Sequence, residues 1–177
     1  MQAITADPRS SVSSKVDPFE RLFVEEYPRV VGIANRVLAD RQEAEDVAQE
    51  VFVDFHRLHR PDAPYAAPWL HRAAAHAALN VIRSRTRRAR RENAFGENFP
   101  STAPDPAVKA EQNETRRLVR RALLQLPAKS ATVLALRYGG LSYAEVASAI
   151  GVNVGQIGTL LKRAEAALRR EVERGTS

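Results

Sequence analysis

The chain lacks cysteine and is poor in methionine and aromatic residues. Its 177 residues include no Cys, one Met and one Trp, and aromatic side chains make up only 6% of the total. The absence of cysteine excludes disulfide bonds and thiol chemistry, and it removes the commonest ligand of structural zinc. Packing alone must hold the fold together, and the few aromatic residues favour small helical cores over a thick β-sandwich.

The sequence also lacks a long hydrophobic run. No stretch is long enough to span a bilayer, and the first 17 residues have no apolar core of a secretory signal. We therefore expect a cytoplasmic protein with no membrane insertion. Basic residues outnumber acidic ones: the chain has 27 Lys and Arg and 21 Asp and Glu, which gives a net charge of +6. This balance favours nucleic acid as a partner over the alternative, an anionic membrane surface.

A motif near the C-terminus predicts two helices joined by a tight turn. Ser142 with Glu145, and Asn153 with Gln156, have the spacing of capping boxes and mark two helix starts. Gly151 lies between them, where the end of a helix favours a residue that tolerates left-handed backbone, so the first helix should end at about residue 150. The connection is short enough for a helix-turn-helix.

The second helix of this motif has two different faces. Its packed side is predicted by apolar residues that recur at helical spacing: Ile157, Leu160, Leu161, Ala164 and Leu168. The opposite side carries side chains that can bond base edges or phosphates: Gln156, Thr159, Lys162 and Arg163. Gly155 beside them permits close approach of the helix backbone to DNA. We predict that this side reads DNA. The alternative is an ordinary amphipathic helix with a solvated charged face.

Two helical segments are expected before residue 60. In residues 19–38 apolar residues recur at helical spacing, and Pro28 should kink or divide this segment. The next helix should start after Asp40, and an apolar stripe follows one of its sides. Beside the stripe lies a row of carboxylates, Glu43, Asp46, Glu50 and Asp54. The row is either a solvated face or a docking surface for a protein partner.

A loop with three prolines at residues 59–68 precedes a helix that should resume at Trp69. Its expected packing side consists of Leu70, Ala73, Ala74, Ala77 and Val81, and Trp69 projects among polar residues: Arg72, His76, Asn80 and Arg83. An aromatic ring among cations suits stacking on an unpaired base. Alternatively, Trp69 folds back onto the loop as a cap on the core.

The helix continues into a dense arginine run, with six arginines from Arg83 to Arg91. Such a single-signed run predicts phosphate contacts, by Arg85, Arg87 and Arg88 among others. Residues 92–107 carry three prolines and no helical period, which indicates a flexible linker. We therefore expect an all-α protein with a disordered tail (1–16), two small helical domains (17–91 and 108–172) and the linker between them.

The residues leave two other classes of function as alternatives. An enzyme would need a metal pair such as His56 and His59 near Asp54, or Asp46 with Glu50, but no third converging ligand is evident. We therefore expect no catalytic residue, metal or cofactor. The other alternative is a conventional helix-turn-helix regulator whose first domain serves as a sensor or dimerisation unit.

Three blocks in order resemble the extracytoplasmic-function group of bacterial sigma-70 factors. EAEDVAQEVF at residues 43–52 resembles the core-binding helix of region two, and PWLHRAAAHAALNVIRSRTRR at 68–88 resembles the promoter-melting segment. LPAKSATVLALRYGGLSYAEVASAIGVNVGQIGTLLKRAEAALRR at 126–170 resembles region four. The resemblance implies two domains, one for each region, and RNA polymerase as the partner that supplies all catalysis.

The resemblance also implies roles for residues. The clamp helices of the largest polymerase subunit would bind Glu43, Asp46, Gln49, Glu50 and Phe52, and the flap is a second expected contact. The minus-ten strand would be opened and captured by Tyr65, Trp69, Arg72, His76, Asn80 and Arg83. The minus-thirty-five element would be read by Gly155, Gln156, Thr159, Lys162 and Arg163. Promoter DNA and an anti-sigma factor are therefore further expected partners.

Four positions depart from the family pattern. His76 and Asn80 stand where the family usually has Asn and Asp in the melting helix, and Gln156 and Gly158 stand where it usually has Thr and Lys. The absence of a carboxylate at residue 80 makes the DNA-facing side more positive. We therefore predict a strong salt dependence of strand binding.

Overall fold

The computed structural model describes residues 17–94 and 108–176, and within these ranges every regular element is an α-helix. The helices are α1 (Pro18–Leu38), α2 (Arg41–Leu58), α3 (Ala66–Ala94), α4 (Val108–Gln125), α5 (Ala128–Tyr138), α6 (Tyr143–Ile150) and α7 (Val154–Thr176). This confirms the all-α fold class. The predicted tail at 1–16 and residues 95–107 of the predicted linker lie outside the described residues.

Helix α1 is a single helix despite its internal proline. The Asp17 side chain caps it by accepting a hydrogen bond from the backbone N–H of Phe19 at 3.2 Å. Pro28 cannot donate to the carbonyl of Val24. Both residues are exposed, so solvent can satisfy that carbonyl, and the helix continues to Leu38. Pro28 therefore does not divide the segment.

Helices α1, α2 and α3 pack together as the first domain. The Asp40 side chain caps α2 as predicted, because it accepts a hydrogen bond from the backbone N–H of Glu43 at 3.0 Å. The largest fully buried side chains here include Phe55, Ile33 and Leu70. A buried polar pair joins α1 to α3, with Nε2 of His71 and Oε2 of Glu26 2.6 Å apart.

Helix α3 begins earlier, ends later and buries a wider face than expected. It starts at Ala66 because Pro68 falls in its first turn, where proline is tolerated, and it runs to Ala94 instead of ending at 91. The predicted packing residues Ala73, Ala77 and Val81 are partly buried and pack against the hydrophobic core. The residues buried in addition to Leu70 and Ala74 are Ala66, His71, Ala75, Ala78, Leu79 and Ile82.

The second domain contains α4 to α7, and α6 and α7 form the predicted helix-turn-helix. Ser142 and Glu145 make a complete capping box, with Glu145 Oε2 2.8 Å from the backbone nitrogen of Ser142. Gly151 ends α6 in left-handed backbone with φ 68°. Ile157, Leu161 and Ala164 are buried, and Leu160 and Leu168 are partly buried against the same core, which confirms the packed side of α7.

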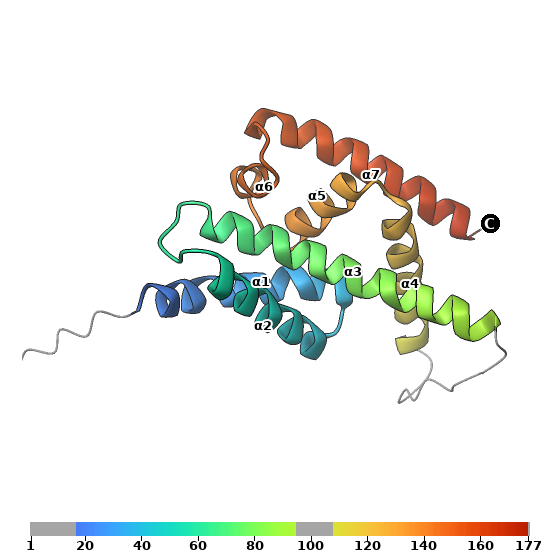
Figure 1. Cartoon of the computed structure of the whole chain (residues 1–177). Helices are drawn as coiled ribbons and strands as arrows, with labels where there is room; N and C mark the ends of the chain where they lie inside the picture. The colour runs from blue at the N-terminus through green and yellow to red at the C-terminus, as the bar shows by residue number, and fades with distance from the viewer. Residues whose placement is uncertain (1–16, 95–107, 177) are drawn as a thin grey trace, which may run out of the picture.

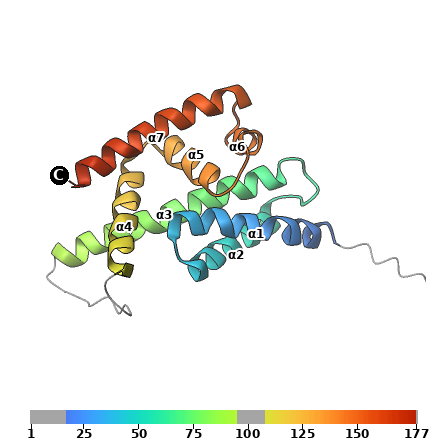
Figure 2. The same cartoon turned by 180° about the vertical axis from the view of Figure 1, so that it is seen from behind.

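The two domains pack against each other. Helix α3 runs between α1 and α2 on one side and α5 to α7 on the other (Figures 1 and 2). It contacts α5 and α6, and α1 contacts α5. Buried apolar residues of both domains therefore belong to one continuous hydrophobic cluster. This second contact explains why α3 buries more of its surface than a helix in a separate three-helix domain would.

Candidate functional site

The carboxylate row on α2 is exposed to solvent except at its first residue. Asp46, Glu50 and Asp54 are exposed, but Glu43 is half-buried and forms an ion pair with Arg85 of α3. The other carboxylate oxygen of Glu43, Oε2, is buried without a hydrogen-bond partner. Glu43 thus links α2 to α3. It is less available to a protein partner than the other three carboxylates.

Phe52 does not present its ring to a partner as the sequence suggested, because it is only 2% exposed. Its ring packs edge-on against Phe23 and Phe19, at centroid distances of 4.9 and 6.2 Å. These rings line one end of an apolar groove of about 330 Å³ between α1 and α2, together with Gln49 and the half-exposed Val53. Phe52 therefore supports this groove from the core, and Gln49 is exposed at its edge.

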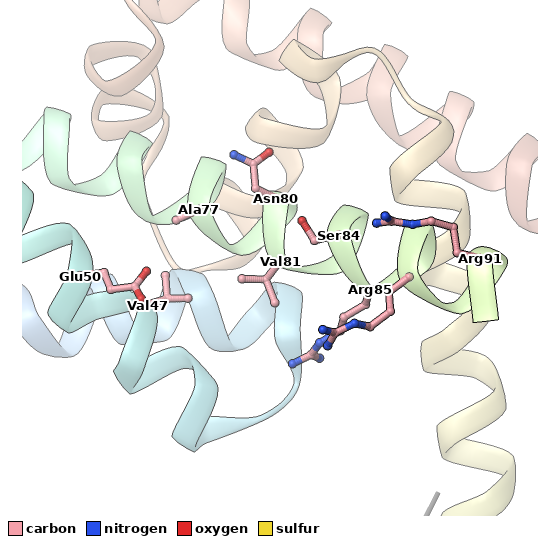
Figure 3. Close-up of a pocket in the computed structure, with 9 residues that line it drawn as sticks. Val47, Glu50, Ala77, Asn80, Val81, Ser84, Arg85 and Arg91 are labelled. Atoms are coloured by element: carbon pink, nitrogen blue, oxygen red, sulfur yellow. The ribbon is translucent and has the colours of Figure 1, made fainter. Parts of the chain in front are cut away.

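Acidic and basic groups meet in a groove between α2 and α3. The groove has a volume of about 620 Å³, and Figure 3 shows Glu50 on one wall and Asn80, Ser84 and Arg85 on the other. Arg91 lies further along α3. The surfaces predicted for the protein partner and for DNA are thus neighbours on adjacent helices.

Trp69 packs on the end of α2. Its ring lies 4.6 Å from that of His59 and 5.5 Å from that of Phe55, between ring centroids. The ring is half-buried. In this structure Trp69 therefore caps the core, as in the alternative interpretation, while Tyr65 beside it is 48% exposed.

The remaining predicted residues of α3 form a polar, positively charged face. Arg72, His76 and Asn80 are exposed, and Arg83 donates a hydrogen bond to Oδ1 of Asn80 at 3.1 Å. Partial burial, followed by the charges of Arg72 and Arg83, lowers the pKa of His76 below its ordinary value. His76 is therefore neutral at pH 7, and the positive charge of this face comes from arginine.

The arginine run lies on the second half of α3. Arg85, Arg87 and Arg88 are all exposed, and Arg85 is the member that pairs with Glu43. Arg120 of α4 is near this run and donates a hydrogen bond to the backbone carbonyl of Leu38. Burial, and then the positive charge of Arg85 and other arginines, lowers the pKa of Arg120. The domain contact thus places cations of both domains near one another.

The N-terminal end of α7 carries the predicted reading face, and its residues are all exposed: Gly155, Gln156, Thr159, Lys162 and Arg163. The predicted capping box is rearranged, because the Asn153 side chain accepts a hydrogen bond from the backbone N–H of Gly155, at 2.9 Å. Gln156 still reaches back, and its Oε1 accepts a hydrogen bond from the backbone N–H of Asn153 at 3.3 Å. Gly155, Gln156, Thr159 and Arg163 line a groove between α7 and α5, and Lys129 of α5, which sequence reasoning missed, lines it too.

The two histidines considered for an enzyme contact different aromatic rings. The ring of His56 packs on Phe19 at 4.5 Å between centroids, and that of His59 packs on Trp69. Among the residues that the structure describes, no three His, Asp, Glu or Cys side chains are placed to hold a metal ion. The positions of His56 and His59 are accounted for by aromatic packing.

Comparison with known families gives two matches in chain order. The model of sigma-70 region 2 matches residues 22–88, and that of sigma-70, region 4 matches residues 116–168. The RNA polymerase sigma-H factor of Pseudomonas aeruginosa is 29% identical, with 88% of this chain and 86% of that protein covered. The ECF RNA polymerase sigma factor SigK of Mycobacterium ulcerans is 30% identical, with 86% and 84% covered.

Solved structures share the fold. The structure of CnrH in complex with the cytosolic domain of CnrY has a TM-score of 0.53, with 22% identity and 88% of each chain covered. The sigma factor RpoE, in complex with the anti-sigma factor NepR from Bartonella quintana, has a TM-score of 0.50 and 20% identity, with 89% of this chain covered. The two family matches and the similarity to SigK show that the chain belongs to the sigma-70 family of RNA polymerase sigma factors, in its extracytoplasmic-function group.

Proposed function

We propose that the chain, as a sigma factor, divides promoter-specific initiation between its two domains. The first domain binds core RNA polymerase and melts the minus-ten element, and the second domain reads the minus-thirty-five element. The observation that carries this division is the exposure of two polar faces on different domains, one along α3 and one on α7. The family matches favour this function over a conventional regulator, because region 2 and region 4 are both present.

Core polymerase is assigned to the exposed part of α2. Asp46, Gln49 and Glu50 are exposed on this helix. Gln49 lines the apolar groove and Glu50 lines the groove towards α3, so α2 offers both negative charge and apolar surface, a combination that suits a basic protein partner. The clamp helices of the largest subunit are the proposed contact there, and the flap is a proposed contact of the second domain. Glu43 and Phe52 support this surface from beneath.

Promoter DNA is assigned to α3 and α7. Arg72, Asn80 and the arginine run offer donors to the minus-ten strand, and Thr159 and Arg163 offer donors to bases of the minus-thirty-five element. Part of the Trp69 ring is already covered by Phe55 and His59. Tyr65 is already exposed, so it is the aromatic residue of this region that is available without rearrangement.

Other partners and the place of action follow from the same assignment. We propose an anti-sigma factor as a regulator, which is supported by the fold shared with RpoE in its complex with NepR. The polymerase supplies the catalysis, and the sigma factor contributes binding groups only. Within the described residues no helix has the length and apolar character to cross a membrane. We place the activity in the cytoplasm, where transcription occurs in bacteria.

Transcription by purified components tests the proposal. The chain is added to core polymerase on genomic DNA of the host bacterium, and the 5′ ends of the transcripts are mapped. A sigma factor gives discrete start sites by itself, whereas a conventional regulator gives them only when another sigma factor is present. A uniform background of transcripts at every protein concentration would contradict the proposal.

A charge reversal tests the assignment of α2. Glu50→Lys should weaken binding of the chain to core polymerase, measured by co-elution or fluorescence polarisation. Glu114→Lys, which makes the same change at an exposed residue of α4, is the matched control and should bind normally. Equal binding by both variants would place the polymerase contact elsewhere on the chain.

A further inference from the structure

A lysine outside the recognition helix completes its groove. Lys129 is the second residue of α5, and α5 packs against α7 (Figure 1). Its side chain lines a groove of about 280 Å³ together with residues of α7: Gly155, Gln156, Thr159, Leu160 and Arg163. Four of these five residues, all except Leu160, belong to the predicted reading face of α7. Lys129 therefore lies on the same surface as that face.

The position of Lys129 is not explained by packing within the domain. Lys129 is exposed, and the buried residues of α5 begin at Ala131. The first turn of α5 contains no acidic residue that would compensate the charge. The lysine therefore offers a solvated ammonium group at the edge of the groove.

The polar groups of α7 can contact bases, and Lys129 is placed to contact the DNA backbone. Oε1 of Gln156 is already used in the turn, where it accepts the backbone N–H of Asn153. Thr159 and Arg163 remain as the groups best placed to reach base edges. A recognition helix in the major groove is flanked by the phosphates of both strands, and contacts to these phosphates fix its orientation.

We propose that Lys129 binds a DNA phosphate that flanks the bases read by α7, and that it thereby sets the angle at which α7 enters the major groove. The inference rests on the proposed function of the second domain. Lysine suits this role because its ammonium is a compact point charge that attracts a phosphate without reading a base. The contact should therefore contribute to affinity equally on all sequences.

Salt titration of DNA binding tests the inference. The full chain is titrated with a duplex of random sequence, and the affinity is measured against salt concentration. K129A should weaken binding and lower the slope of log K against log salt by about 1, whereas K129R should keep the wild-type slope. R169A is the control, because Arg169 is an exposed cation of the same domain that lines the groove between α1, α4, α5 and α7. An unchanged slope for K129A would overturn the inference.

The absence of cysteine permits a chemical rescue of the same position. K129C carries the only thiol of the variant, and alkylation with 2-bromoethylamine restores a side-chain amine there. The untreated variant should bind random duplex as weakly as K129A, and the alkylated variant should recover both affinity and slope. Circular dichroism of each variant confirms that the fold is intact. Failure to recover on alkylation, with an intact fold, would contradict a role for the charge.

A third variant separates this inference from the function on which it depends. R163A should reduce discrimination between random duplex and duplex selected by the wild-type chain from a random pool. If R163A and K129A both bind and discriminate as the wild type does, the proposed reading of DNA by the second domain fails. If only R163A has an effect, the inference about Lys129 fails alone. A loss in K129A that is confined to the selected duplex would indicate base reading and overturn the phosphate contact.

Discussion

The guanidinium of Arg29 lies 2.5 Å from the carboxylate of Glu145, between residues 116 positions apart in the chain. Arg29 belongs to α1 and Glu145 to α6, so this ion pair joins the two domains. Glu145 serves the capping box of α6 with the same carboxylate. One side chain therefore contributes both to a local helix start and to the packing of the two domains.

Stability should depend on the ionisation of Glu145. Hydrogen bonds from the backbone and side chain of Ser142, followed by the pairing with Arg29, lower the pKa of Glu145 from 4.5 to about 2. Because the folded state has the lower pKa, this contribution is present above pH 4.5 and is lost as the pH falls towards 2. Thermal melts of the wild type and E145Q should therefore differ at pH 6 and converge in acid.

The domain contact itself is measured by a double-mutant cycle. R29M and E145Q each remove the ion pair, and their coupling should be about 0.2–1 kcal/mol because the pair is partly exposed. E145Q should cost more than R29M, since it also weakens the cap. Additive effects of the two substitutions would show that the pair contributes nothing across the interface.

Substitution of Gly139 should loosen the packing of the domains. A Cβ at this position would lie 2.9 Å from Cα of Ile33 in α1 and 2.8 Å from the carbonyl oxygen of Ala135. The backbone of Gly139 has φ −75°, which any residue adopts, so the glycine is required by space. Gly139→Val should increase the radius of gyration measured by small-angle scattering.

Gly158→Ala is the control for that experiment. A Cβ there meets Tyr143 only at 3.9 Å, so the domain arrangement should be unchanged. Circular dichroism should show equal helical content in both variants. An unchanged radius of gyration for Gly139→Val, with normal helical content, would mean that the interface adapts to the added side chain.

DNA binding should strengthen as the pH falls. The folded chain holds the pKa of His76 below its ordinary value of 6.5, and nearby phosphates would raise it again. Binding at the α3 face should therefore take up a proton, and affinity for single-stranded DNA should rise between about pH 8 and 6. His76→Gln should remove this part of the pH dependence. The same pH dependence in the variant would exclude His76 from the contact.

The buried pair of Glu26 and His71 should matter for stability. Glu26 is 5% exposed and His71 2% exposed, so removal of one partner leaves the other unsatisfied in the core. Glu26→Ala should lower the free energy of unfolding by about 1–3 kcal/mol. Glu26→Gln, which can keep a hydrogen bond to His71, should lose less in the same denaturant titration. Equal losses would assign the cost to packing.

Local patterns predicted the helix starts well. The caps at Asp40 and Ser142, and the left-handed end of α6 at Gly151, were all confirmed. Each depends on residues within a few positions of one another, so spacing in the sequence is enough to predict it. The packed side of α7 was predicted for the same reason, because its apolar residues recur at helical spacing.

Predictions failed where a residue contacts another residue far away in the sequence. The prediction for the packing side of α3 was incomplete, because this helix contacts both domains and periodicity along the chain does not show the second contact. Phe52 is buried because aromatic residues of α1 cover it, and Glu43 is drawn into an ion pair with Arg85. Phe52 lies on the apolar side of α2 that helical periodicity predicts, so local spacing favoured its burial and only the family resemblance placed it in the docking surface. The ion pair of Glu43 has no signal in local spacing. The groove that contains Lys129 was missed for the same reason, since α5 and α7 are brought together only by folding.

The sequence by itself determined the helices, their caps, the polar faces of α3 and α7 and membership of the family, because all of these are encoded in periodic or contiguous residues. Only the tertiary structure decided how those faces are used. In the folded chain Glu50 lines one groove with Asn80 and Arg85, and the ring of Trp69 packs on that of Phe55. Gly139 lies close to Ile33 of α1, where the two domains pack together. Such contacts depend on how helices pack over long sequence separations, which periodicity along the chain does not specify.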